Sequence, residues 1–119
     1  ASLLKMSYAA YSKGASALLL SANALAEAGG VTEALHNEWA ISAPSLLKQS
    51  QRAAQMTSGK AWRFEGEMLE ISETYSNAGL PDALHAGAAA VYERMAALKD
   101  LPPQELEAVV AALLRQPGD

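Results

Sequence analysis

Residues 3–28 read LLKMSYAAYSKGASALLLSANALAEA, and this stretch decides the fold. Alanine and leucine dominate it, and both favour helix. The pair Gly29-Gly30 follows directly and suits a left-handed helix C-terminus. We therefore predict one long helix, flanked on both sides and central to its domain. Helical spacing places a seam of mostly small residues on one face, where another backbone can approach closely: Ser7, Ala10, Gly14, Ala17, Ser21 and Leu25.

Composition narrows the class of protein. The chain has 119 residues, which suits one domain, and half of them are hydrophobic. A net charge of −4 without a basic stripe argues against a nucleic-acid partner. No apolar run reaches the ~18 residues of a membrane span. The absence of cysteine excludes a disulfide scaffold and fits a reducing compartment, so we expect a cytoplasmic protein.

Glycine and proline divide the rest of the chain into further helices. Short turns between them predict that consecutive helices pack as neighbours. The expected fold is all-α, with about six helices packed around the long first one. Besides residues 2–28, we expect helices over about 32–39, from Pro44 to Gly59, over 61–78, over 81–98, and after Pro103. Thr32 is expected to cap the second of these helices with its hydroxyl group.

One lysine lies among apolar neighbours in the first helix. A buried lysine has a lowered pKa and can carry a proton, which makes Lys5 the best lead to chemistry. Tyr8, Ala9 and Ser12 follow on the next two turns of the same face, where Tyr8 and Ser12 would position a substrate by hydrogen bonds. A simpler interpretation is that Lys5 extends into water near a helix end, and spacing alone favours it.

Other candidate sites are weaker. Glu67 and Glu70 lie one helical turn apart and would suit acid–base work or a divalent cation, although a solvated acidic face explains them more simply. His36 and His85 lack partners at metal-ligand spacing, so we expect no metal site. Gly29-Gly30 ends a helix instead of opening one, so the dinucleotide-binding fingerprint is absent.

Two segments carry a family resemblance. The first is residues 1–14, ASLLKMSYAAYSKG, continued by residues 17–19, 24–26, 30–31 and 38–39. The second is residues 61–72, AWRFEGEMLEIS, followed by residues 78–81. In this order and spacing the chain resembles the C-terminal helical domain of NAD-binding phosphogluconate dehydrogenase-like proteins. These proteins are relatives of the β-hydroxyacid dehydrogenases, such as 3-hydroxyisobutyrate and 6-phosphogluconate dehydrogenases.

The resemblance implies an activity and a role for Lys5. In that superfamily an N-terminal Rossmann domain holds NAD or NADP, and a lysine near the start of the long helix is the general acid/base. Lys5 matches that lysine by position. Residues 1–119 would then be one helical C-terminal domain cut from an NAD(P)-dependent oxidoreductase of hydroxy acids. The chain alone would be inactive, because its Rossmann domain is absent.

Two departures leave the substrate open. Better-known relatives carry asparagine on the turn after the lysine, where this chain has Tyr8 and Ala9. They also carry a second lysine in a Lys-Asp-Leu segment, which corresponds here to Gly66-Glu67-Met68. Either this branch takes a different substrate, or other side chains replace those contacts. The candidate substrate-binding residues are Tyr8, Ser12, Lys13 and Glu67.

The sequence also suggests how the domain associates. The small-residue seam and the apolar last helix predict a homodimer. An alternative from a different functional class is a non-catalytic helical dimerisation or interaction module, in which Lys5 would be dispensable.

Overall fold

The computed structural model describes residues 2–116. Its first helix, α1 (Leu3–Ala28), has the predicted bounds. Ser2 caps the N-terminus with its hydroxyl oxygen, which accepts a hydrogen bond of 3.2 Å from the backbone N–H of Lys5. At the other end Gly30 has a φ of +72°, and the N–H of Val31 bonds the carbonyl of Ala26 at 2.8 Å. This geometry is a Schellman C-cap, which glycine adopts without steric cost.

The other elements confirm the predicted all-α class. Every regular element within residues 2–116 is helical. In chain order they are α2 (Thr32–Ser42), α3 (Leu46–Thr57), α4 (Ala61–Asn77), α5 (Ala83–Arg94), the short 3-10 helix η1 (Ala96–Leu98) and α6 (Leu106–Leu114).

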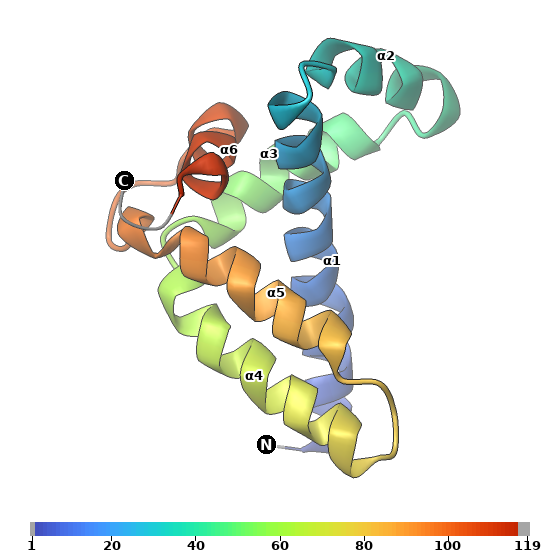
Figure 1. The fold of residues 1–119 in the computed structure, drawn as a ribbon, viewed down its shortest axis with the longest axis vertical. Helices are drawn as coiled ribbons and strands as arrows, with labels where there is room; N and C mark the ends of the chain where they lie inside the picture. The colour runs from blue at the N-terminus through green and yellow to red at the C-terminus, as the bar shows by residue number, and fades with distance from the viewer. Residues whose placement is uncertain (1, 117–119) are drawn as a thin grey trace.

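The long helix organises the domain. At about 1.5 Å per residue, α1 is roughly 39 Å long, which matches the longest extent of the molecule, 40 Å. It contacts all five other α-helices. The helices α4 and α5 form an antiparallel hairpin that lies across α1 (Figure 1). The core gathers where they meet, and its largest fully buried side chains include Leu20, Met68, Ile71, Tyr92, Met95 and Val109.

Local details differ from the sequence-based expectations. Thr32 does not cap α2; it is the first residue of that helix, and its hydroxyl donates instead to the Glu27 carboxylate. The helix itself continues to Ser42, past the expected end at Trp39. The fifth predicted helix is divided at Met95 into α5 and η1. Among the described residues, no helix combines the length and apolarity needed to cross a bilayer.

Candidate functional site

Lys5 occupies the first turn of α1, and its side chain is exposed. Within the described residues its ammonium makes no hydrogen bond or ion pair, so this domain alone does not enclose it. The positive end of the helix macrodipole lies in this turn, where a cation is disfavoured. Lys5 is therefore a charge that the domain neither buries nor pairs.

Tyr8 and Ser12 share the open face with Lys5. Tyr8 is exposed, and Ser12 is half-buried on the following turn. Neither side-chain hydroxyl has a hydrogen-bond partner among residues 2–116. The same face is covered farther along the helix, where α3 packs on it and Asn23 is buried. The uncovered end of this face therefore presents an ammonium and two hydroxyl groups.

Lys13 and Glu67 meet in space, although 54 residues separate them. The Lys13 Nζ lies 2.7 Å and 2.8 Å from the two carboxylate oxygens of Glu67. It also lies 4.5 Å from the centre of the Phe64 ring, which adds a cation–π contact. About a third of each charged side chain is exposed. The pair joins α1 to α4, some 12 Å along the helix from Lys5.

Tyr92 supports the Lys13–Glu67 ion pair from the buried side, through contacts with Phe64 and with the backbone of Lys13. Its side chain is fully buried, and its ring meets Phe64 edge-on at 5.4 Å between centres. Its hydroxyl donates a short hydrogen bond of 2.5 Å to the backbone carbonyl of Lys13. Burial raises the pKa of Tyr92 well above its ordinary value, and the negative charge of Glu67 raises it further. A neutral, hydrogen-bonded phenol thus ties α5 to α1 beneath the Lys13–Glu67 pair.

The raised pKa of Tyr92 predicts a loss of stability in strong alkali. In the unfolded chain a tyrosine loses its proton near pH 10. In the folded state Tyr92 keeps its proton to higher pH, so its contribution to stability is complete below pH ~10 and falls as pH rises above it. Urea unfolding of Tyr92→Phe should show a shallower decline above pH ~10 than the parent chain. Tyr8→Phe is the exposed control and should decline like the parent. Equal declines in all three proteins would contradict the assignment.

The acidic residues of α4 have separate environments. Glu67 pairs with Lys13, while Glu70 and Glu73 are exposed. Burial and the neighbouring Glu93 carboxyl raise the pKa of Glu65 above its ordinary value. Within residues 2–116 no group of three histidine or acidic side chains lies close enough to hold a metal ion. The hypothesis of a cation at Glu67 and Glu70 therefore has no supporting ligand set in this domain.

The small-residue seam of α1 receives α5 at Gly14. A groove of about 520 Å³ runs between the two helices. Beneath it the buried His85 donates from Nε2 to the Ala10 carbonyl at 2.9 Å, since a carbonyl oxygen only accepts. The His85 ring stacks on Tyr75 at 4.9 Å between centres. A Cβ atom on Gly14 would lie 3.0 Å from His85 Nε2, which explains the glycine.

This contact predicts opposite effects for two glycine substitutions. Gly14→Ala gains about 1 kcal/mol of helix propensity but crowds an imidazole held by Ala10 and Tyr75, so we expect a net loss of ~1 kcal/mol. Gly66→Ala is the matched control. It lies within α4, and an added Cβ would meet nothing within 4 Å, so it should gain ~1 kcal/mol. Urea unfolding measures both, and equal stabilisation would show that His85 yields without cost.

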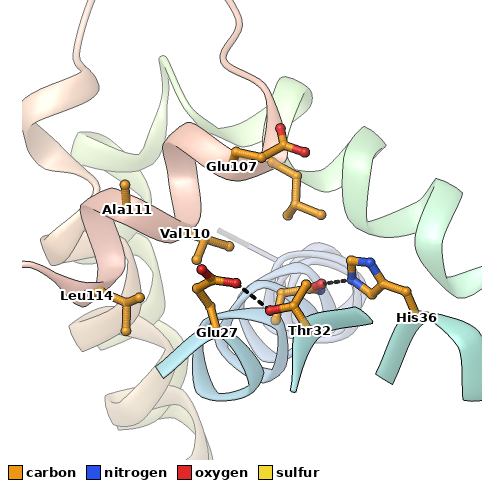
Figure 2. A pocket seen from close by; sticks show the side chains of 9 residues that line it. Glu27, Thr32, His36, Glu107, Val110, Ala111 and Leu114 are labelled. Carbon is orange, nitrogen blue, oxygen red and sulfur yellow. Dashed lines mark hydrogen bonds between the residues drawn. The ribbon is translucent and has the colours of Figure 1, made fainter. Parts of the chain in front are cut away.

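A second pocket of about 230 Å³ lies between α1, α2 and α6. Figure 2 shows Glu27, Thr32 and His36 on one side and Glu107 of α6 across from them. Most of the polar side chains that line this pocket form hydrogen bonds with one another. Thr32 donates to Glu27, and His36 Nε2 donates to Asn23 Oδ1 at 2.8 Å, because the Asn23 amide nitrogen already donates to Leu19 and Ser50. This network fixes α2 on α1.

The candidate residues of the open α1 face lie outside both hollows. Neither this pocket nor the α1–α5 groove is lined by Lys5, Tyr8 or Ser12.

Comparison with known proteins places the chain in a family. The sequence model of a family described as a domain of unknown function, DUF1932, matches residues 26–95, more than half of the chain. The chain belongs to the DUF1932 family. The match covers the end of α1 and the helices α2 to α5. In this DUF1932 domain the open face around Lys5 therefore belongs to the part of α1 that precedes the matched residues. No curated protein and no solved structure matches the chain significantly.

The structural roles of two groups of residues in this DUF1932 domain were not predicted from the sequence. One is His85 with Tyr75, which fill the seam opposite Gly14. The other is Tyr92, which supports the Lys13–Glu67 pair. Gly14 itself was the available signal, because a glycine within a long helix indicates a close neighbour.

Proposed function

We propose that this chain is the helical C-terminal domain of an NAD(P)-dependent dehydrogenase of the β-hydroxyacid type, and that Lys5 is its general acid/base. Domains of the DUF1932 family occur in the C-terminal region of NAD-binding 6-phosphogluconate dehydrogenase-like proteins, which supports the proposal. The all-α fold around one long first helix agrees with it.

The observation that carries the proposal is the uncovered end of the α1 face. Lys5 lies there without a partner among residues 2–116, in a helical turn where the macrodipole disfavours a cation. Two hydroxyl groups accompany it, on Tyr8 and Ser12. Farther along, the same face is closed by α3 around Asn23. A second domain packed on the open end would desolvate Lys5 and complete a cleft between the domains, the usual place for a substrate site.

Residues 2–116 contain no glycine-rich turn between a strand and a helix, the usual dinucleotide-binding element. The only adjacent glycines, Gly29 and Gly30, follow the helix α1, whereas the phosphate-binding turn of a Rossmann domain follows a strand. NAD or NADP would therefore be held by a Rossmann domain elsewhere in the protein. In this chemistry the hydride leaves the carbinol carbon of the substrate for the nicotinamide ring.

The residues of α1 would handle the proton. An enclosed lysine gives up its own proton more readily, and the free amine can then accept one. Neutral Lys5 would take the proton from the hydroxyl of a hydroxy acid as the carbonyl forms, and would return it in the reverse reaction. Tyr8 and Ser12 would orient the substrate by hydrogen bonds. Lys13 and Glu67 are bonded to each other, so they would contact only a substrate that extends along α1.

An assay of the protein that includes its dinucleotide-binding domain tests this function. It should oxidise a small hydroxy acid with NAD⁺ or NADP⁺, while the isolated chain should bind no NADH in a fluorescence titration. Tight NADH binding by the isolated chain would show that the division of roles between the two domains is wrong.

The second candidate function is a non-catalytic dimerisation or interaction module. It is favoured by large apolar side chains that are exposed on α1, such as Tyr11 and Leu18. Under this hypothesis Lys5 would be dispensable for any activity of the complete protein, which separates the two candidates.

A further inference from the structure

Lys13 is the second of the two cations on α1. The helix carries no arginine, and Lys5 and Lys13 are its only lysines. Ala9 lies midway between them, one helical turn from each. It contributes only a methyl group, and it is partly buried against the core. The two lysines therefore flank a small residue, which leaves room between them for a bound molecule.

The Lys13 ammonium is held by two independent contacts. Its Nζ lies 2.7 Å and 2.8 Å from the carboxylate oxygens of Glu67 and 4.5 Å from the centre of the Phe64 ring. Phe64 is buried and meets Tyr92 edge-on, so Nζ would keep its place over the ring if Glu67 moved away. About a third of each charged side chain is exposed, so another anion can reach the pair. The ammonium is thus fixed on its buried side, while its anionic partner can be exchanged.

Glu67 has an alternative partner on its own helix. Arg63 precedes it by four residues, which places the two side chains on adjacent turns of α4. Arg63 is exposed, and its side chain makes no ion pair or hydrogen bond within residues 2–116. Glu67 can therefore leave Lys13 and still pair with a cation.

The hydroxy acid of the proposed function brings a charge that needs a partner. Its carboxylate is ionised at neutral pH, and a cleft between two domains would take it out of bulk water. An enclosed carboxylate needs a hydrogen-bonded cation. Lys5 does not serve, because the proposed proton transfer requires its neutral amine. Lys13 is the remaining cation of α1, and its partner Glu67 is a carboxylate of the same charge.

We propose that the carboxylate of the substrate replaces Glu67 on the Lys13 ammonium, and that Glu67 then pairs with Arg63. Lys13 keeps one carboxylate partner throughout, so the exchange never leaves its charge unpaired in the closed cleft. Glu67 competes with the substrate and so sets its affinity. Arg63 is a positioning residue that acts through Glu67. The inference rests on the proposed function, which supplies the carboxylate, and it names the substrate group that Lys13 binds.

Steady-state kinetics of the protein that includes the dinucleotide-binding domain tests the exchange, with the hydroxy acid that it oxidises as the varied substrate. Lys13→Met should raise KM at least about tenfold, because a charge-assisted hydrogen bond is lost. Glu67→Gln should lower KM about fivefold, because a neutral amide does not compete for the ammonium. In both variants kcat should stay within about twofold of the parent value.

Arg63 provides a second kinetic test. Arg63→Gln should raise KM about twofold, and this effect should vanish when Glu67→Gln is also present, since Arg63 acts only through Glu67. Arg52→Gln, on α3, and Glu73→Gln, on α4, are the matched controls, because both residues are exposed; they should leave KM unchanged. A parent-like KM in Lys13→Met, or an increased KM in Glu67→Gln, would overturn the proposal.

A titration of this chain separates the inference from the proposed function, because it needs no cofactor. The ¹³Cε resonance of Lys13 is followed by NMR while sodium glycerate, a small hydroxy acid, is added. Glu67→Gln should bind glycerate about fivefold more tightly than the parent chain, and exposed Lys48 should respond only at concentrations at least about tenfold higher. If Lys13 in Glu67→Gln responds no differently from Lys48, the exchange is refuted. If Lys5→Ala keeps the parent rate while the titration succeeds, the proposed function fails and the carboxylate site at Lys13 stands.

Discussion

Replacing Lys5 with alanine in the protein that includes the dinucleotide-binding domain will lower kcat by a factor of roughly 10²–10⁴, the usual contribution of a general acid/base. The reason is that, among residues 2–116, no other lysine lies on the uncovered end of the α1 face. Lys13, the next lysine along the helix, is held by Glu67. Steady-state kinetics at saturating cofactor measures the effect.

The controls separate catalysis from folding and cofactor binding. Lys5 is exposed, and its ammonium makes no hydrogen bond or ion pair with residues 2–116, so Lys5→Ala should leave the thermal midpoint nearly unchanged. The affinity for NAD(P)H should also remain within about threefold of the parent value. Lys48→Ala removes an exposed lysine from α3 and should retain full turnover. A Lys5→Ala protein with the parent rate would favour the non-catalytic interaction module instead.

Tyr92→Ala should cause the largest loss of stability, with a decrease of about 3–5 kcal/mol in the free energy of unfolding. The substitution empties a fully buried site, removes the edge-on contact with Phe64 and deletes the hydrogen bond to the Lys13 carbonyl. Since a domain of this size has ~5–15 kcal/mol of total stability, the variant should be near the limit of folding. Urea unfolding monitored by circular dichroism gives the difference.

Tyr8→Ala is the matched control for this prediction, because it makes the same substitution in the same fold. Tyr8 is 77% exposed on α1, so the change should stay within about 0.5 kcal/mol. A Tyr92→Ala variant as stable as Tyr8→Ala would show that the α1–α4–α5 junction does not depend on Tyr92.

Local pattern predicted the helices well. The bounds of α1 follow from its composition and from the glycine pair at its end, and Gly14 correctly indicated a close neighbour. These features depend on residues adjacent in sequence. The prediction that Thr32 caps α2 was wrong. A hydroxyl near a helix start can bond either the backbone or a nearby carboxylate, and Thr32 donates to the carboxylate of Glu27.

The candidate site could be predicted only in part. Lys13 and Glu67 were both named from the sequence, but their pairing depends on how α4 crosses α1, which helical periodicity does not determine. Tyr92 and His85 reach α1 from 79 and 75 residues away for the same reason. Lys5 is exposed in this domain, and under the proposed function its environment would depend on a second domain packed against it.

Chemical rescue tests the central claim most directly. In Lys5→Ala, the deleted side chain leaves room beside the substrate for a small primary amine. We predict that ethylamine restores turnover in proportion to its concentration, by about tenfold or more, and that it leaves Lys48→Ala and the parent protein unaffected. An unimpaired Lys5→Ala protein, or an inactive one that no amine of any size or pKa rescues, would contradict a proton-transfer role for Lys5.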